Sequence, residues 1–125
     1  MPDGVSTIGD GAFYRCRNLE QVSLYNVNTI GNRAFQGCEH LLSVGIPETV
    51  TTIGTYAFAG CDLSRGVYCY ATTPPTVVCD RYTNLWGAFD SPNIRSIYVP
   101  RYSVEDYKAA NGWKEYIDLL EADNF

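Results

Sequence analysis

The chain has 125 residues, which is enough for one domain and too short for two independent cores. Hydrophobic residues make up 46% of it and charged residues 18%, the balance of an ordinary globular protein. The net charge is −5, and no cluster of Lys or Arg is present that would neutralise a run of phosphates. No apolar run reaches the ~18 to 20 residues that a bilayer span requires. We therefore expect one folded domain with no nucleic-acid partner and no membrane span.

A repeated pattern begins near the N-terminus and occurs three times. Each copy contains an Ile-Gly pair, an Ala-Phe pair, a cysteine three residues after the phenylalanine and a valine nine residues after it. The phenylalanines are Phe13, Phe35 and Phe58, at intervals of 22 and 23 residues. A unit of this length cannot bury its apolar side chains alone. We predict that successive copies stack and share one core, with the phenylalanines in a continuous ladder.

Each repeat is expected to contribute one short parallel strand. The stretches from Leu19 to Leu24 and from Leu41 to Ile46 end in alternating apolar and polar residues, which is typical of a half-buried strand. The Ile-Gly-x-x-Ala-Phe-x-x-Cys segment is expected to fold back over the strand as a tight helical or 3₁₀ turn. Its glycine is expected to supply a backbone angle or a close approach that a Cβ would obstruct. The predicted fold class is α/β, a right-handed repeat solenoid.

The pattern weakens after the third copy. Residues from Ala71 to Thr76 include two adjacent prolines, which exclude a central strand and predict a loop. The next Ala-Phe pair, Ala88-Phe89, lies 31 residues beyond Phe58, so this unit contains an insertion. A degenerate repeat then ends in the alternating segment from Ile94 to Pro100.

The residues after this repeat change character and predict a helical cap. Ser103 is expected to cap a helix, with Asp106 three residues later, and Asn111-Gly112 is expected to end it. Two apolar faces would cover the exposed end of the stack. The first comprises Val104, Tyr107 and Ala110, and the second comprises Trp113, Tyr116, Ile117 and Leu120.

The whole chain is interpreted as one domain, residues 1–125. Within it we expect repeats over 1–70, an irregular insertion over 71–87, a degenerate repeat over 88–100 and the cap over 101–125. No equivalent cap is expected at the front, because Met1 to Val5 aligns with Ile46 to Val50 in mid-repeat. This indicates a C-terminal fragment of a longer array. The alternative is a short protein whose uncapped N-terminal end pairs with another chain, which would allow self-association.

The complete unit reads Ile-Pro-x-x-Val-x-x-Ile-Gly-x-x-Ala-Phe-x-x-Cys-x-x-Leu-x-x-Val-x-Ile and is nearly whole between Pro47 and Val67. It resembles the BspA-like leucine-rich repeat, also called the Treponema pallidum type. The segments Val67 to Pro75, Ile97 to Pro100 and Tyr107 to Trp113 also resemble the C-terminal arrangement common in that family. The resemblance therefore covers nearly the whole chain.

This resemblance implies an extracellular or cell-surface protein of a host-associated anaerobic bacterium, whose relatives are linked with adhesion to host proteins and to other cells. It implies no catalytic residue, and we expect no cofactor. The chain departs from the family pattern in the insertion from Asp80 to Trp86 and in the extra Cys79. Residues Met1 to Gly4 form no recognisable signal peptide, so the export expectation rests on the resemblance.

The cysteines are expected to be thiols with no metal. Cys16, Cys38 and Cys61 share one repeat position, and parallel side chains in a ladder stay too far apart for disulfide geometry. Cys69 points inward by strand parity and Cys79 lies in the insertion. A disulfide between Cys69 and Cys79 remains an alternative. Because the chain has five cysteines, at least one of them must stay unpaired within the chain.

No catalytic or metal site is predicted. The chain has no C-x-x-C pair and no glycine-rich phosphate loop. Its lone histidine, His40, occupies a variable position that is expected to face solvent, and the repeat pattern places no candidate nucleophile beside it. The acidic residues Glu48, Glu105, Asp106 and Glu115 show no defined spacing, so solvated carboxylates are favoured over a glycosidase pair. We therefore expect no enzyme activity.

The outward side chains of the strands are the candidate binding residues. Strand alternation turns four tyrosines, Tyr25, Tyr68, Tyr70 and Tyr98, toward one outer face. Tyrosine offers a large contact area and a hydroxyl with little rotamer entropy to lose, and it is enriched in binding surfaces. The opposing interpretation is that tyrosine merely favours strands, or that the loop over residues 71 to 86 covers this face.

The sequence thus predicts an extracellular protein-binding or adhesion module whose partner is a host or bacterial surface protein. Two alternatives stay open. In one, these turns and their cap only terminate a longer array; in the other, the aromatic surface binds carbohydrate.

Overall fold

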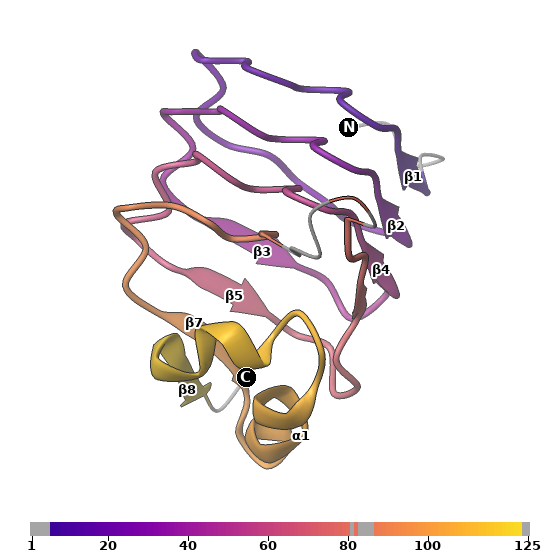
Figure 1. The fold of residues 1–125 in the computed structure, drawn as a ribbon, viewed down its shortest axis with the longest axis vertical. Helices are drawn as coiled ribbons and strands as arrows, with labels where there is room; N and C mark the ends of the chain where they lie inside the picture. The colour runs from indigo at the N-terminus through magenta and orange to yellow at the C-terminus, as the bar shows by residue number, and fades with distance from the viewer. Residues whose placement is uncertain (1–5, 81, 83–86, 124–125) are drawn as a thin grey trace.

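The structure is a computed structural model that describes residues 6–80, 82 and 87–123. The chain winds through successive turns that lie one on another, and Figure 1 shows the first turn at the top and the C-terminal helices at the bottom. Equivalent residues of neighbouring turns are paired in register. The repeat seen in the sequence is therefore also the spatial repeat of the fold.

Two parallel four-stranded sheets run along the stack. Sheet A has the order β1-β2-β4-β6, formed by Thr7–Ile8, Thr29–Ile30, Thr52–Ile53 and Thr76–Val77. Sheet B has the order β3-β5-β7-β8, formed by Val44–Ile46, Val67–Cys69, Ile97–Pro100 and Leu120–Asp123. Sheet A lies at the right of Figure 1, and sheet B passes through its middle and lower part.

The expectation of one strand per repeat was wrong, because a full turn contributes a strand to each sheet. The additional strands consist of only two residues, too few to show a period-two pattern in the sequence. Strand β6 lies within the segment predicted as a loop and pairs with β4. The predicted strand ending at Leu24 is not formed, and the first turn is therefore absent from sheet B among the described residues.

The Ile-Gly-x-x-Ala-Phe segments form consecutive turns and not the helical turn that was expected. The residue before each Ala-Phe pair is left-handed, with φ of 56° at Arg33 and at Tyr56, which interrupts a right-handed helix. The backbone N–H of each phenylalanine instead donates to the next turn. Phe35, for example, donates to the carbonyl of Ala57 at 2.8 Å.

The glycine of each Ile-Gly pair is explained by a close approach of backbones. A Cβ on Gly54 would lie 2.3 Å from the backbone nitrogen of Asn32, and one on Gly31 would lie 2.6 Å from that of Asp10. Gly9 has no preceding turn beside it among the described residues, and its Cβ would meet nothing within 4 Å. Of the two reasons considered for this glycine, spatial restriction is the one that applies.

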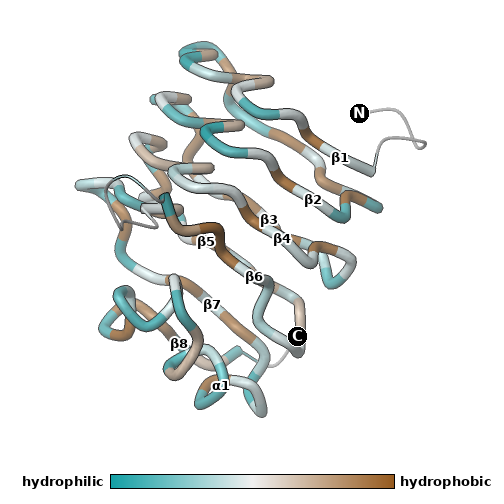
Figure 2. Tube along the Cα trace, turned by 45° about the vertical axis from the view of Figure 1, so that its right-hand side comes forward, coloured by the Kyte–Doolittle hydropathy of each residue, from teal (hydrophilic) through white to brown (hydrophobic). Residues whose placement is uncertain are grey.

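The core follows the stack as a ladder of phenylalanine rings. Phe13, Phe35, Phe58 and Phe89 stack with centroids 5.1, 5.2 and 5.6 Å apart and with planes within 3°. The predicted ladder is confirmed, and it continues across the insertion. Figure 2 shows the hydrophobic stretches recurring at equivalent places in successive turns.

The ladder ends on aromatic residues of the C-terminal segment. This segment contains η1 (Arg101–Ser103), α1 (Val104–Ala109), η2 (Lys114–Leu119) and β8. Trp113 packs on Phe89 with centroids 5.3 Å apart, and Tyr116 meets the same ring edge-on at 5.8 Å. Tyr107 packs edge-on against Trp113 at 4.9 Å. The indole N–H of Trp113 donates to the carbonyl of Pro75 at 2.8 Å, which ties the segment to the insertion.

Two details of the C-terminal prediction were wrong. The Ser103 hydroxyl makes no helix cap, because it donates to the carbonyl of Thr72 at 2.7 Å. Ile117 is 45% exposed and does not join Trp113, Tyr116 and Leu120 in the core. Leu120 begins strand β8, which pairs in parallel with β7.

Candidate binding surface on sheet B

The candidate surface is built by strand alternation in sheet B. The inward side chains of strands β3, β5 and β7 are buried; they are Val44, Ile46, Val67, Cys69, Ile97 and Val99. The residues between them point outward, and the parallel register places Gly45 beside Tyr68 and Tyr68 beside Tyr98. We call Tyr25, Tyr68, Tyr70 and Tyr98 the tyrosine face. The inward and outward assignment made from the sequence is correct for these strands.

Tyr68 and Tyr98 form the centre of the tyrosine face. Their rings stack with centroids 4.9 Å apart and an angle of 13° between the ring planes, and both side chains are half-buried. The Tyr68 hydroxyl donates to the carbonyl of Arg65 at 3.1 Å, which fixes the ring against the start of its own strand. The pair is thus held in place before any partner binds.

Tyr25 and Tyr70 stand beside a shallow depression at one side of this face. Tyr25 is 69% exposed and Tyr70 is 42% exposed. The depression has a volume of about 300 Å³ and is lined by Val22, Ser23, Leu24, Tyr25, Gly45, Pro47 and Tyr70. The sequence pattern did not predict the depression. This depression depends on the first turn staying outside sheet B, which no local pattern indicates.

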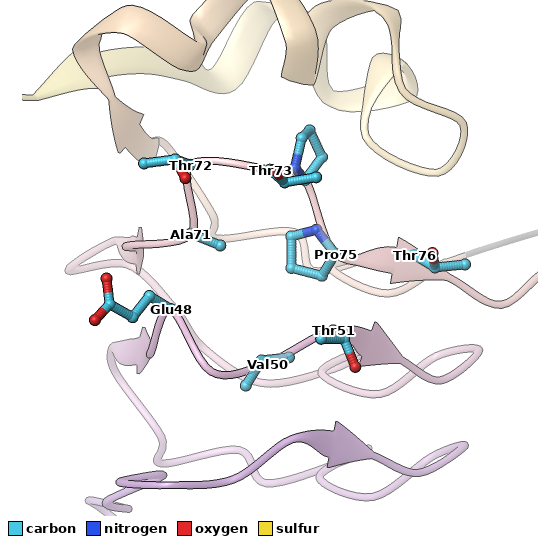
Figure 3. Close-up of a pocket in the computed structure, with 9 residues that line it drawn as sticks. Glu48, Val50, Thr51, Ala71, Thr72, Thr73, Pro75 and Thr76 are labelled. Atoms are coloured by element: carbon cyan, nitrogen blue, oxygen red, sulfur yellow. The ribbon is translucent and has the colours of Figure 1, made fainter.

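The described part of the insertion does not cover the tyrosine face. Strand β6 joins sheet A, and Val78, Cys79 and Asp80 line a hollow with Asn32 and Arg33 on that side. The segment before β6 passes the turn between β3 and β4. Figure 3 shows Glu48, Val50 and Thr51 on one turn and Ala71 to Thr76 on the next, around a hollow of about 410 Å³. Most of Asp80 to Trp86 lies outside the described residues.

All five cysteines are free thiols in the structure. The Cys38 and Cys61 thiols donate to the carbonyls of Phe13 and Phe35, at 3.2 and 3.0 Å. Cys69 is buried against Tyr107, whose hydroxyl lies 3.2 Å from its sulfur. Because that hydroxyl donates to the carbonyl of Ala71 at 2.6 Å, the thiol is the donor to Tyr107. Cys69 therefore has a partner in the core, whereas Cys79 lies beside sheet A.

The buried thiols are expected to react more slowly than the exposed thiol of Cys16, because burial raises their pKa. Burial, with a smaller effect of the neighbouring Cys38, raises the pKa of Cys61 to about 12, and burial raises the pKa of Cys69 and of Cys38. At pH 8 we expect a thiol-specific disulfide reagent to modify exposed Cys16 at least about a hundredfold faster than Cys61 in the folded protein. Peptide mass spectrometry after timed quenching would measure both rates.

A Cys16→Ser variant is the matched control for this labelling, since it removes the fast site and leaves the buried thiols unchanged. Denaturant should then expose Cys61 to the reagent. Labelling of Cys61 as fast as Cys16 in the native protein would contradict the buried position of the thiol.

Candidate metal ligands among the described residues are their His, Cys, Asp and Glu side chains. His40 is exposed, and its Nδ1–H donates to the carbonyl of Arg17. Within residues 6–80, 82 and 87–123, no group of three or more His, Cys, Asp or Glu side chains is placed to hold a metal ion. In the same part of the chain, no helix has the length and apolarity that a bilayer crossing demands.

Comparison with known proteins agrees with this architecture. No curated protein matches the chain in sequence. A family model does match residues 1–73, and its description is a BspA type leucine rich repeat region (6 copies). That match covers more than half of the chain and includes all three clear repeats and strands β1 to β5. The chain belongs to the BspA-type leucine-rich-repeat family.

Proposed function

We propose that this chain is a protein-binding repeat module that acts at the cell surface or outside the cell, and that the tyrosine face is its contact surface. The observation that carries the proposal is the continuity of this face. Stacked Tyr68 and Tyr98 adjoin the depression between Tyr25 and Tyr70, and the described part of the insertion leaves them open. Membership of a leucine-rich-repeat family supports a binding role over an enzymatic one.

The chemistry of this face suits protein recognition. Tyrosine rings supply apolar area, and their hydroxyls supply hydrogen bonds at the rim of an interface. The Tyr68 and Tyr98 rings are already ordered by stacking, so a partner would lose little entropy in fixing them. We propose a host or bacterial surface protein as the partner, as the family resemblance implies.

We also infer a structural role for the C-terminal segment. The turns would form the end of a solenoid, and residues 101–123 would cap it. Support comes from Trp113 and Tyr116, which cover the outer side of Phe89, and from Tyr107 behind them. A stack of repeats requires such a terminal layer, because its last apolar face has no further turn to cover it. This role is compatible with binding through the tyrosine face.

A triple variant tests the binding proposal. Replacing Tyr68, Tyr70 and Tyr98 with alanine should weaken binding to immobilised host matrix proteins by at least about tenfold, because truncated aromatic anchors are typical hot spots. Surface plasmon resonance would give the affinities, and circular dichroism would check the fold. The control variant replaces Tyr14 and Tyr82, which are exposed outside sheet B, and it should bind as the parent chain does.

The possible outcomes distinguish protein binding by the tyrosine face from a purely structural role and from carbohydrate binding. Unchanged adhesion by a folded triple variant would remove the tyrosine face as the contact surface and leave the structural role alone. Loss of binding to a glycan array, with protein binding intact, would instead favour the carbohydrate alternative.

A further inference from the structure

We propose that the depression between Tyr25 and Tyr70 binds a proline-rich segment of a partner protein in the extended polyproline II conformation. This inference rests on the proposed protein-binding function and names the kind of segment that the face would recognise. Its site is lined by seven residues, which come from the first turn, from strand β3 and the residue after it, and from the residue that follows strand β5.

The lining combines two exposed tyrosines with a glycine that has no side chain. Ile46 pairs with Cys69 across the sheet, so the next residues, Pro47 and Tyr70, are also neighbours. Tyr70 leans over Gly45, where an added Cβ would lie 3.6 Å from the Cε2 atom of the ring. Gly45 itself has no side chain and remains exposed in the lining. Proline-rich segments dock in grooves of this kind, where aromatic walls contact the pyrrolidine rings.

The charge of the lining selects an uncharged occupant. All seven lining residues are uncharged, whereas four other hollows of the described surface each contain a charged side chain, among them Glu48, Arg15, Arg33 and Arg65. An acidic or basic peptide would therefore gain no ion pair here. A proline-rich segment has no side-chain charge to desolvate, and its apolar rings match apolar walls.

The available hydrogen bonds favour peptide over sugar. The only side-chain polar groups of the lining are the hydroxyls of Ser23, Tyr25 and Tyr70. A sugar presents many hydroxyls, and those buried without partners would cost free energy. A polyproline II segment has no internal hydrogen bonds, so its carbonyls are free to accept from a few hydroxyl donors. The three hydroxyls of the lining are donors of this type.

An added β-strand is a poorer occupant for the same place. Strand β3 is the outermost strand of sheet B toward the N-terminus, but Val22, Ser23 and Leu24 of the first turn line the depression next to it. These residues are the first-turn equivalents of Val44 to Ile46 in the repeat and lie on this side of β3. A segment that needs contacts to side chains, and not a free sheet edge, fits the space that remains.

A decaproline peptide and a Gly-Ser peptide of equal length test the proposal on the full chain. We expect decaproline to bind with a Kd below about 1 mM and to shift the NMR signals of Tyr25, Gly45 and Tyr70. Gly45→Val adds a side chain to the lining with a residue that strands favour, and Tyr25→Ala removes one of its two tyrosines. Each should weaken decaproline binding by at least about tenfold, while Tyr82→Ala should leave it within about twofold.

Several results would overturn the inference. They are the absence of saturable decaproline binding, equal binding of the Gly-Ser peptide, and unchanged decaproline affinity in a folded Gly45→Val variant. Failure here is separable from failure of the proposed function. If the triple tyrosine variant loses protein binding while decaproline never binds, the tyrosine face remains a contact surface and only the proline-rich ligand is rejected.

Discussion

Replacing Gly54 with alanine is expected to lower the free energy of unfolding by more than about 3 kcal/mol. The new Cβ would lie 2.3 Å from the backbone nitrogen of Asn32 and 2.4 to 2.5 Å from the carbonyl group of Gly31. Both neighbours are backbone atoms of the preceding turn, so neither can rotate away as a side chain would. The turns would have to separate. Urea denaturation followed by circular dichroism would measure the loss.

Gly9→Ala is the matched control, because Gly9 is the glycine of the first Ile-Gly pair, as Gly54 is of the third, but no preceding turn lies beside it among the described residues. Its Cβ would meet no atom within 4 Å. The unfolding free energy should change by no more than about 0.5 kcal/mol. Equal destabilisation by the two substitutions would mean that the glycine serves a backbone conformation and that the close approach is not its reason.

Phe58→Ala is expected to destabilise the fold by about 3 to 5 kcal/mol. Phe58 is 0% exposed and lies in the ladder between Phe35 and Phe89, whose ring centroids are 5.2 and 5.6 Å away. Truncation would remove ring contacts on both sides and leave a cavity that rigid parallel turns cannot close. The thermal midpoint and the urea midpoint should both fall, and either transition measures the effect.

Phe13→Ala provides the comparison for this prediction. Phe13 stacks on Phe35 at 5.1 Å but is only partly buried at the first described turn. We expect it to cost less than half as much as Phe58→Ala, since less apolar area leaves water. A loss as large as that of Phe58→Ala would contradict the idea that each ring is stabilised by neighbours on both sides.

The part of the fold that could be predicted from the sequence is the part set by side-chain periodicity. Recurring phenylalanines and cysteines gave the stack, and alternation around Val44, Val67 and Ile97 gave the inward and outward faces. The Thr-Ile strands of sheet A were missed, because two residues show no period and their pairing comes only from the next turn. Left-handed Arg33 and Tyr56 were missed because neither residue type indicates a positive φ.

The candidate surface shows the same division. The outward direction of Tyr68 and Tyr98 was predicted from alternation, whereas the stacking of their rings was seen only in the structure, where the parallel register pairs the two residues. The depression beside Tyr25 did not follow, because it requires the first turn to stay out of sheet B. The partner of Cys69 is Tyr107, 38 residues away, and a contact of that range has no local sequence pattern.

The direction of the hydrogen bonds in the Ala-Phe turns gives this one column of peptide groups an electric polarity, whereas the N–H groups of Gly31 and Gly54 donate toward the preceding turn. Each phenylalanine N–H donates toward the following turn, so the peptide dipoles of this column align as they do in a helix. The column ends at Phe89, whose N–H donates to the Tyr116 hydroxyl at 3.1 Å, and that hydroxyl donates to the Asp90 carboxylate at 2.6 Å. An anion thus sits at the positive pole. The last turn is terminated electrostatically in the manner of a capped helix N-terminus.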